Sequence, residues 1–243
     1  MKGQRNILLT GGSGVLGGAL RRLLPELDAP GETEFDVTQP GQMEDYLKGR
    51  SLSCIIHAAA FVSPPLVDRE PLRAVEVNII GTANVVRLCM QRGLRLVYIS
   101  TDYVFRGDRG NYTEEDAVYP VNKYAWSKLG GECAVRLCDN ALIIRTTFGP
   151  DVFPYPKAFV DQWTSREPVS RIAARMVPAI LSDVTGVLHI GGPRKSVHEY
   201  AVSLDGARPI APLRRCEVDF DVPEDTSLDT ARYDALFSKG IMP

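Results

Sequence analysis

A short apolar strand, a glycine-rich turn and a helix pattern follow one another near the start of the chain. Residues 6–10 form an apolar run bounded by glycines, which predicts a buried strand. The turn after it holds Gly11, Gly14 and Gly17, and leucines recur at helical spacing from Leu16 onward. This order is the context that a dinucleotide-binding fingerprint requires, and it constrains the fold more than any other stretch.

The three glycines have separate physical reasons. Gly11 permits the tight turn, Gly14 lets the backbone approach a pyrophosphate at the helix N-terminus, and Gly17 allows the helix to pack closely on the strand. The spacing is TGxxGxxG rather than GxGxxG. A flexible turn at a strand end is the alternative, and the flanking strand and helix favour cofactor binding.

Further apolar runs alternate with helix patterns along the chain. Buried strands are expected over residues 53–57, 96–99 and 141–145. A long amphipathic helix is expected over residues 71–92, closed by Gly93. This alternation predicts an α/β protein with a Rossmann-type doubly wound parallel sheet over residues 1–148.

The composition changes after Gly149, where prolines become frequent. Helix patterns are expected over residues 158–164, 172–181, 197–204 and 231–237, with a strand over 187–190. We expect residues 149–243 to form a small substrate-binding lobe, shortened and partly interleaved with the first domain, that closes over the crevice.

The bulk composition excludes several classes of partner. A net charge of −2 over 243 residues gives no reason to expect nucleic acid or an anionic membrane. The apolar run after residues 1–5 is too short for a signal peptide, and no later run could cross a bilayer. The five cysteines include no CxxC, and we expect reduced, buried thiols in a cytoplasmic protein. The three histidines have no metal-ligand spacing, so no metal site is expected.

A tyrosine and a lysine four residues apart, Tyr124 and Lys128, share one face of a predicted helix. A neighbouring ammonium favours the phenolate and lowers the pKa of a tyrosine, so such a pair can exchange a proton with the oxygen of a carbonyl while a hydride moves. Chance also produces this spacing, because Tyr119 and Lys123 repeat it. Pro120 disfavours helix at that first tyrosine.

The region after the first helix is short. Residues 25–30 leave little room for a second strand, and neither Glu26 nor Asp28 ends a clear one, so the choice between NAD and NADP is poorly encoded. Residues 34–38 are predicted to form the end of a short strand. Thr38 is expected to cap the helix that begins near Pro40. Asp36 has two interpretations that we hold equal: an acceptor for an adenine amino group, or a turn aspartate.

Small and polar residues mark other strand ends and helix faces. Ala58, Ala59 and Ala60 would let a flat cofactor lie against the backbone, and close packing is the alternative. We expect His57 to be a satisfied core histidine. Asn78 interrupts the apolar face of the long helix and is expected to brace neighbouring backbone rather than contact substrate.

These pieces together resemble the extended short-chain dehydrogenase/reductase superfamily, and within it the dTDP-4-dehydrorhamnose reductase family. The motifs that carry the resemblance are TGGSGVLG at 10–17, FDVT at 35–38, AAA at 58–60, STDYVF at 100–105, PVNKY at 120–124, KLGGE at 128–132 and DTSLD at 225–229. The resemblance covers most of the first 150 residues and is thinner afterwards.

The resemblance implies a site and a reaction. Thr101, Tyr124 and Lys128 would be the catalytic set, with Thr101 bonding a ketone oxygen, Tyr124 donating the proton and Lys128 holding the nicotinamide ribose. The implied cofactor contacts are Ser13, Gly14, Val15, Leu16, Asp36, Val37, Ala58, Ala59 and Ala60, beside Gly11 and Gly17. The implied chemistry is reduction of a 4-keto deoxysugar nucleotide with NADP(H) or NAD(H). The expected partner is thus a small-molecule substrate, a nucleotide sugar. For the assembly of the chain itself we consider a homodimer.

One position favours reduction over elimination. Related sugar-nucleotide dehydratases place a glutamate base directly after Thr-Asp, whereas here that position is Tyr103. The chain also departs from the reductases: residues 61–68 are longer and residues 149–159 are abbreviated. After the abbreviated stretch, Asp161, Gln162 and Arg171 are candidates for the pocket, with the helix surface as the favoured place for Arg171.

Two other functions stay open because of these departures. One is a non-catalytic nucleotide-binding subunit, since the resemblance extends to a regulatory subunit of methionine adenosyltransferase. The other is a sugar-nucleotide epimerase of the same superfamily.

Overall fold

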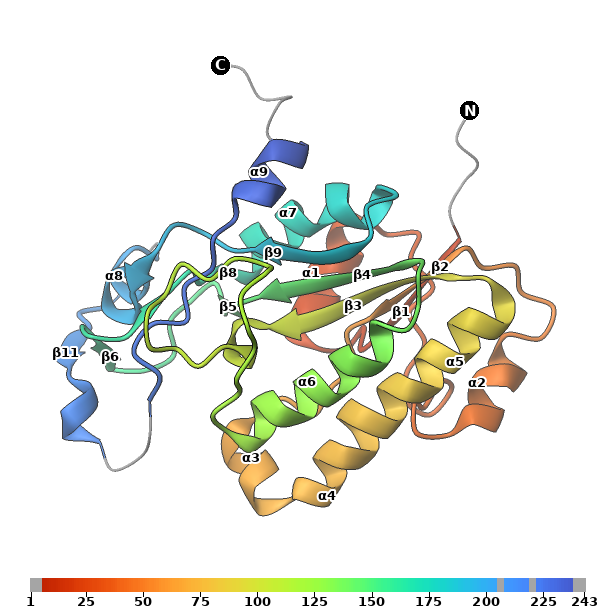
Figure 1. Cartoon of the computed structure of the whole chain (residues 1–243), viewed down its shortest axis with the longest axis horizontal. Helices are drawn as coiled ribbons and strands as arrows, with labels where there is room; N and C mark the ends of the chain where they lie inside the picture. The colour runs from red at the N-terminus through yellow and green to blue at the C-terminus, as the bar shows by residue number, and fades with distance from the viewer. Residues whose placement is uncertain (1–5, 205–207, 219–221, 238–243) are drawn as a thin grey trace.

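The computed structural model describes residues 6–204, 208–218 and 222–237, and within them the centre is a five-stranded sheet (Figure 1). The strands lie in the order β1-β2-β3-β4-β9, and every neighbouring pair is parallel. Their bounds are β1 Ile7–Thr10, β2 Cys54–His57, β3 Arg95–Thr101, β4 Ala141–Thr146 and β9 Gly186–Ile190. Nearly every strand residue is buried, which explains the continuous apolar runs that predicted them.

Helices cover both faces of the sheet (Figure 1). One face carries α1 Val15–Leu23, α7 Val169–Leu181 and α9 Ala231–Phe237. The other carries α2 Pro40–Tyr46, α5 Thr82–Arg92 and α6 Lys123–Val135, with α3 Pro64–Arg69 beside α6. The doubly wound parallel fold that the sequence predicts is therefore confirmed.

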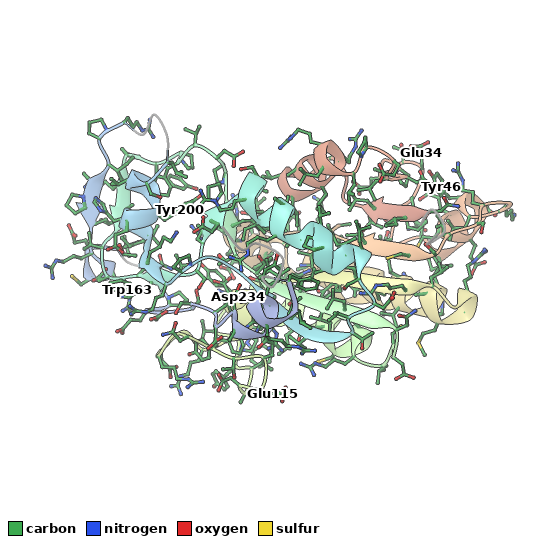
Figure 2. The ribbon with its side chains drawn as sticks, turned by 90° about the horizontal axis from the view of Figure 1, so that it is seen from above. Glu34, Tyr46, Glu115, Trp163, Tyr200 and Asp234 are labelled. Carbon is green, nitrogen blue, oxygen red and sulfur yellow. The ribbon has the colours of Figure 1, made fainter. Side chains whose placement is uncertain are left out.

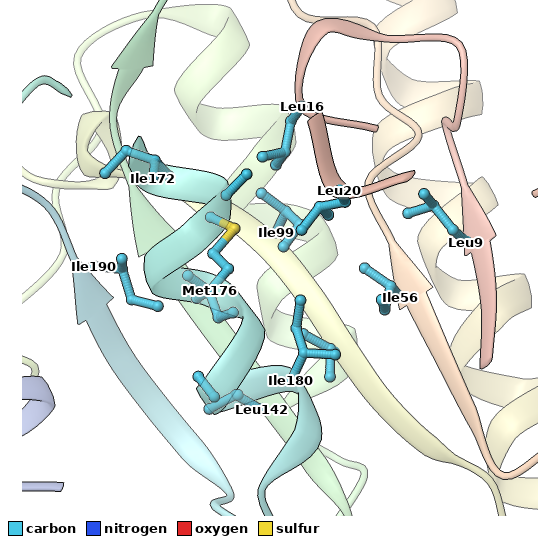
Figure 3. Packing of buried hydrophobic residues seen from close by; sticks show 14 of the residues in the cluster. Leu9, Leu16, Leu20, Ile56, Ile99, Leu142, Ile172, Met176, Ile180 and Ile190 are labelled. Carbon is cyan, nitrogen blue, oxygen red and sulfur yellow. The ribbon is translucent and has the colours of Figure 1, made fainter. Parts of the chain in front are cut away.

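Alternate strand residues fill two hydrophobic cores, because successive side chains of a strand point to opposite faces. Figure 3 shows one core, where Met176 of α7 and Leu20 of α1 pack near Ile99 of β3. Strand residues of the other parity, such as Leu8 and Tyr98, lie in the second core with α5 and α6. The sheet is thus held rigidly from both sides, which fixes the loops at its carboxyl edge.

The long predicted helix over residues 71–92 forms, but not as one regular α-helix. It consists of α4 Pro71–Ala74, a π-helical stretch Val75–Gly81 and α5. Gly93 closes it in the left-handed conformation, with φ of 64°. The π-helical stretch carries the buried Asn78.

The stretch between α1 and β2 contains less regular structure than expected. No strand forms over residues 34–38, because the N–H groups of Glu34 and Phe35 both bond back to the carbonyl of Gly31 in a closed turn. The predicted cap of α2 is also wrong. Thr38 donates its N–H and its hydroxyl to Asp36 Oδ1, and the residue that precedes α2 is Gln39, without a side-chain cap.

Beyond the carboxyl ends of the main strands, short strand pairs gather at one end of the molecule (Figure 1). The pairs are β5 Phe148–Gly149 with β8 Glu167–Pro168, β6 Lys157–Phe159 with β11 Ala211–Leu213, and β7 Trp163–Thr164 with β10 Lys195–Ser196, and α8 Val197–Val202 follows. The helix predicted over residues 158–164 is therefore wrong, since strand pairing with distant segments satisfies that backbone instead. The helices predicted near 172–181, 197–204 and 231–237 are confirmed, as α7, α8 and α9.

Three cysteines are buried, as expected, and two are not. Cys133 lies on the outer face of α6 and Cys216 in a surface turn, and none of the five cysteines, all of which lie in the described ranges, forms a disulfide. Within the described ranges, no helix has the length and apolar character needed to span a membrane. Residues 1–5, which precede the run considered as a signal segment, lie outside those ranges.

Candidate functional site

A pocket of about 600 Å³ opens at the carboxyl ends of β1, β2 and β3. Every residue that the sequence assigns to cofactor binding or catalysis lines it, from the glycine turn through the three alanines to Thr101, Tyr124 and Lys128. The structure therefore brings together groups that are spread over more than one hundred residues of sequence. Their roles stay predictions, but their convergence is a property of the fold.

The glycine turn forms a cradle that side chains would fill. Gly11 has φ of 75°, and a Cβ there would lie 2.6 Å from the backbone nitrogen of Ala59. A Cβ at Gly17 would collide with the carbonyl oxygen of Gly11. α1 begins after Gly14 without a side-chain cap, and Gly14, Val15 and Leu16 line the pocket, so the N-terminus of the helix lies at the pocket wall. Such a helix N-terminus fits the pyrophosphate of a dinucleotide.

The histidine at the end of β2 is a core residue, as predicted. His57 bonds the Thr10 hydroxyl through Nδ1 at 2.8 Å and the Thr82 hydroxyl through Nε2 at 3.0 Å. Burial lowers its pKa to about 3, and the charge of Lys128 adds to the effect. Thr10 in turn accepts the N–H of Ala59, which holds the alanine stretch against β1.

Asp36 combines features of both proposed roles. Its Oδ1 accepts two bonds from Thr38, as a turn aspartate does, and the residue also lines the pocket beside Val37. The turn interpretation is confirmed, and the adenine contact stays a prediction.

Helix α6 places Tyr124 and Lys128 one turn apart on the wall of the pocket. The helix begins where it does because Asn122 caps it, accepting the N–H of Ala125 at 2.8 Å. Tyr119 lies before the helix and is 59% exposed, so the second Tyr/Lys spacing forms no matching pair.

Burial dominates the electrostatics of this pair. It lowers the pKa of Lys128 to about 7, with Glu132 partly opposing the change. The Lys128 ammonium lies 4.2 Å from the centre of the Tyr98 ring, a cation–π contact. Burial also raises the pKa of Tyr124 above its ordinary value, Asp102 adds to this, and a hydrogen bond with Thr101 opposes it. The expected lowering of the Tyr124 pKa is therefore wrong for the protein alone, because desolvation disfavours the phenolate more than its neighbours favour it.

The end of β3 supplies a buried hydroxyl beside this pair. Thr101 donates to Asp102 Oδ1 at 3.2 Å and accepts the N–H of Tyr103 at 3.3 Å. Tyr103 lines the pocket, and burial raises its pKa, which the charge of Arg166 opposes. The position that a dehydratase would use for a carboxylate base thus holds a neutral phenol.

Two buried networks fix α6 relative to the sheet. Asn78 bonds both the N–H and the carbonyl of Phe61 and also the Ser127 hydroxyl, so its predicted bracing role is confirmed. Below the pocket, Glu132 accepts bonds from Ser100 at 2.9 Å and from Arg145 at 2.5 and 3.2 Å. Lys128 stands between these two anchors on α6, which sets its position.

Three charged residues of the pocket lie outside the motifs that predicted it. Glu32, Arg73 and Arg166 all line the pocket. Arg166 reaches the pocket because β7 and β8 place its segment there, a pairing that local sequence patterns do not encode. Of the candidates for the pocket, Asp161 and Gln162 are absent from its lining. Arg171 is exposed and pairs with Glu167, so the helix-surface position that the sequence favours for it is confirmed.

Comparison with known proteins identifies the family of this chain. The family described as the RmlD substrate binding domain matches residues 5–170, more than half of the chain. The chain belongs to this family. The resemblance to dTDP-4-dehydrorhamnose reductases and to the extended short-chain dehydrogenase/reductase superfamily is thereby confirmed.

Individual members of the RmlD family and its relatives show how far the similarity extends. The dTDP-4-dehydrorhamnose reductase of Aggregatibacter actinomycetemcomitans is 29% identical over 75% of this chain, and the alignment spans 65% of that enzyme, just under two thirds. The beta subunit of methionine adenosyltransferase 2 from Bos taurus is 26% identical over 96% of this chain and 82% of its own length.

Solved structures of the same type superpose on nearly the whole chain. A hypothetical dTDP-4-dehydrorhamnose reductase from Sulfolobus tokodaii has a TM-score of 0.83 at 28% identity, covering 96% of this chain and 95% of its own. The reductase from Bacillus anthracis, in complex with NADP, has a TM-score of 0.86 at 24% identity, covering 96% and 93%.

Proposed function

We propose that this protein is an NAD(P)H-dependent reductase that converts the 4-keto group of a deoxysugar nucleotide to an alcohol, as dTDP-4-dehydrorhamnose reductases do. The observation that carries the proposal is that Thr101, Tyr124 and Lys128 line one pocket with the glycine turn of residues 11–17. Membership of the RmlD family and the NADP complex of a relative with the same fold support it.

The cofactor half of the pocket follows from the cradle. The N-terminus of α1 receives the pyrophosphate, and Lys128 bonds the nicotinamide ribose. Lys128 suits this role because its buried ammonium makes no hydrogen bond or ion pair with other described residues. A bound nicotinamide cofactor supplies the hydride.

The catalytic half supplies the proton. Thr101 orients the ketone by donating to its oxygen the hydroxyl proton that it gives to Asp102 in the protein alone. Tyr124 transfers its proton to the same oxygen as negative charge develops there. The raised pKa of Tyr124 keeps the phenol protonated before the reaction, which is the form that reduction requires. Tyr103, also held neutral, provides no base for abstraction beside the ketone.

Arg166 is the residue that we assign to binding the anionic diphosphate of the substrate. Its Nε is buried and has no hydrogen-bond partner among the described residues. Its charge is near enough to lower the pKa of Asp102 and of Tyr103, so it lies beside the reacting end of the pocket. A guanidinium with a free donor fits the diphosphate of a nucleotide sugar.

The direct test is a reductase assay. The purified protein is mixed with NADH or NADPH and a dTDP-4-keto-6-deoxyhexose, and loss of reduced-nicotinamide absorbance is followed while the alcohol product is detected by mass spectrometry. Turnover of the keto sugar is the expected result. Cofactor binding with no turnover of any keto sugar nucleotide would exclude the proposal, and interconversion of sugars without net cofactor oxidation would identify an epimerase.

A subunit role is the second candidate, because the similarity to a methionine adenosyltransferase subunit extends over 96% of the chain. Gel filtration of the protein with a methionine adenosyltransferase catalytic chain decides this point. A stable complex, together with no keto-sugar turnover, would favour the subunit role over the reductase.

A further inference from the structure

The second strand of the dinucleotide fold is reduced to a single bridging residue, Asp28. Asp28 pairs in parallel with Leu8 of β1, on the side of β1 away from β2. The Leu9 N–H donates to the Asp28 carbonyl at 2.8 Å, and the Asp28 N–H donates to the Ile7 carbonyl at 3.0 Å. The link from α1 therefore does join the sheet, although too briefly for the sequence to reveal it.

The chain then leaves this strand at the pocket. Ala29 packs against Gly12 of the glycine turn, and Pro30 and Glu32 line the pocket wall. Glu32 stands 21 residues after Gly11. In dinucleotide-binding folds an acidic residue about 20 residues beyond the glycines bonds the 2′-hydroxyl of the adenosine ribose. The fold thus places Glu32 where the ribose-binding acidic residue is expected. The sequence could not assign that role to Glu26 or Asp28.

Between residues 28 and 36, Glu32 is also the acidic side chain that is left without a hydrogen-bond or ion-pair partner among the described residues. Asp28 accepts bonds from the Tyr46 hydroxyl at 2.6 Å and from Arg50 at 3.3 Å. Glu34 accepts the N–H of Gly31 at 3.2 Å, and Asp36 binds Thr38. Within the described ranges, Glu32 makes no such bond. Its exposed carboxylate is therefore available to a ligand in the pocket.

The pocket lining on the side of Glu32 is unsuited to a phosphate. From Gly11 to Val37, the residues that line the pocket include the carboxylates of Glu32 and Asp36 and no lysine or arginine. Arg73, elsewhere on the wall, stacks on Phe61 and lies near Glu70. A 2′-phosphate carrying about two negative charges would be repelled here, whereas a hydroxyl would donate a hydrogen bond.

We propose that Glu32 selects NAD(H) over NADP(H) by accepting a hydrogen bond from the adenosine ribose 2′-hydroxyl and repelling a 2′-phosphate. This inference rests on the dinucleotide site of the proposed function and specifies its cofactor. It sets this chain apart from its Bacillus anthracis relative, which was solved with NADP.

Binding measurements test the inference without catalysis. Dissociation constants for NADH and NADPH are measured by fluorescence titration for the wild type, Glu32→Gln and Glu34→Gln. Glu34 is the matched control, because it lies two residues away, does not line the pocket, and as glutamine can still accept the Gly31 N–H. Figure 2 shows Glu34 near Tyr46, at the end of the molecule opposite Trp163 and Tyr200.

We expect the wild type to bind NADH about tenfold or more tightly than NADPH, the value of a hydrogen bond to a charged group. Glu32→Gln should weaken NADH and strengthen NADPH, and Glu34→Gln should keep the wild-type ratio. Equal or tighter NADPH binding by the wild type, or the same ratio in both variants, would overturn the role of Glu32 and leave the reductase proposal standing. Failure of both cofactors to bind would overturn both.

Discussion

The hydroxyl of Thr226 donates a hydrogen bond of 2.7 Å to the carboxylate of Asp102, which stands 124 residues earlier in the chain. Both residues are buried, and Asp102 directly follows Thr101 at the carboxyl end of β3. The bond therefore ties the segment 225–229 to the edge of the sheet where Thr101 and Asp102 line the pocket. Burial raises the pKa of Asp102 to about 6, and the bond from Thr226 opposes that rise.

Replacing Asp102 by asparagine should change how the free energy of unfolding depends on pH. The folded-state pKa lies above that of an unfolded aspartate, so the contribution of Asp102 to stability is full below about pH 4 and is lost as the pH rises through about 6. Asparagine stays neutral. Urea unfolding at pH 4.5 and 7.5 should show Asp102→Asn gaining stability relative to wild type at the higher pH. A difference that does not vary with pH would contradict this.

Removing the hydroxyl of Tyr124 should abolish proton donation and little else. Under the proposed function, kcat of Tyr124→Phe falls by about 10²–10⁴-fold, the usual contribution of a general acid. Tyr119→Phe is the control, since Tyr119 has the same spacing to a lysine but lies exposed outside the helix. Steady-state rates and cofactor dissociation constants are compared. Equal losses in the two variants would show that Tyr124 is not the acid.

Lys128→Met should stabilise the protein at neutral pH. Because the folded-state pKa of Lys128 is lowered to about 7, the unfolded chain binds one more proton between about pH 7 and 10.5, and the free energy of unfolding rises with pH over this range. The methionine variant lacks that dependence. It should exceed wild type by up to a few kcal/mol at pH 7, at about 1.4 kcal/mol per pKa unit. Denaturant unfolding at pH 7 and 10 should show the two proteins converging, and a gap that widens would refute this.

The two arginines that contact Glu132 allow a test of the buried network. Glu132→Gln leaves the fully buried Arg145 without its counter-charge, which should cost about 3–5 kcal/mol of stability. Arg136→Ala removes a half-exposed guanidinium from the same carboxylate and should cost about 0–1 kcal/mol. Chemical denaturation measures both, and comparable losses would mean that the buried pair does not anchor α6.

Truncating Arg166 should affect the sugar nucleotide and spare the cofactor. Arg166→Ala is expected to raise KM for the keto sugar nucleotide by about tenfold or more, since a charge-assisted bond to a phosphate is lost. Arg171→Ala, five residues on and exposed beside Glu167, should leave KM unchanged. Should the cofactor dissociation constant rise instead, Arg166 would belong to the dinucleotide half of the pocket.

Most of the sheet could be predicted from the sequence because its strands are buried on both faces. In a run such as residues 141–145, every residue before the final arginine is apolar, and so the run stands out without any partner. Tyr124 and Lys128 were likewise accessible, because one helix carries both and local spacing alone places them on one face.

The errors come from backbone whose partners are distant or irregular. β6 looked helical because nothing local indicates that it pairs with β11, more than fifty residues later. Residues 34–38 looked like a strand, but the turn at Gly31 and the bonds to Asp36 satisfy that backbone instead. Arg166 and Glu32 escaped notice for the same reason, since long-range topology brings them to the pocket.

The contacts of the segment 225–229 have a consequence for synthesis. Asp225 and Asp229 donate their N–H groups to the carbonyls of Gly107 and Tyr112, in addition to the bond from Thr226 to Asp102. A ribosome releases these residues only after the sheet strands, the glycine turn and α6 have all emerged. The carboxyl edge of the sheet in a nascent chain therefore gains these contacts only after residues 225–229 have been made, and the pocket wall at Asp102 is completed after the sheet itself.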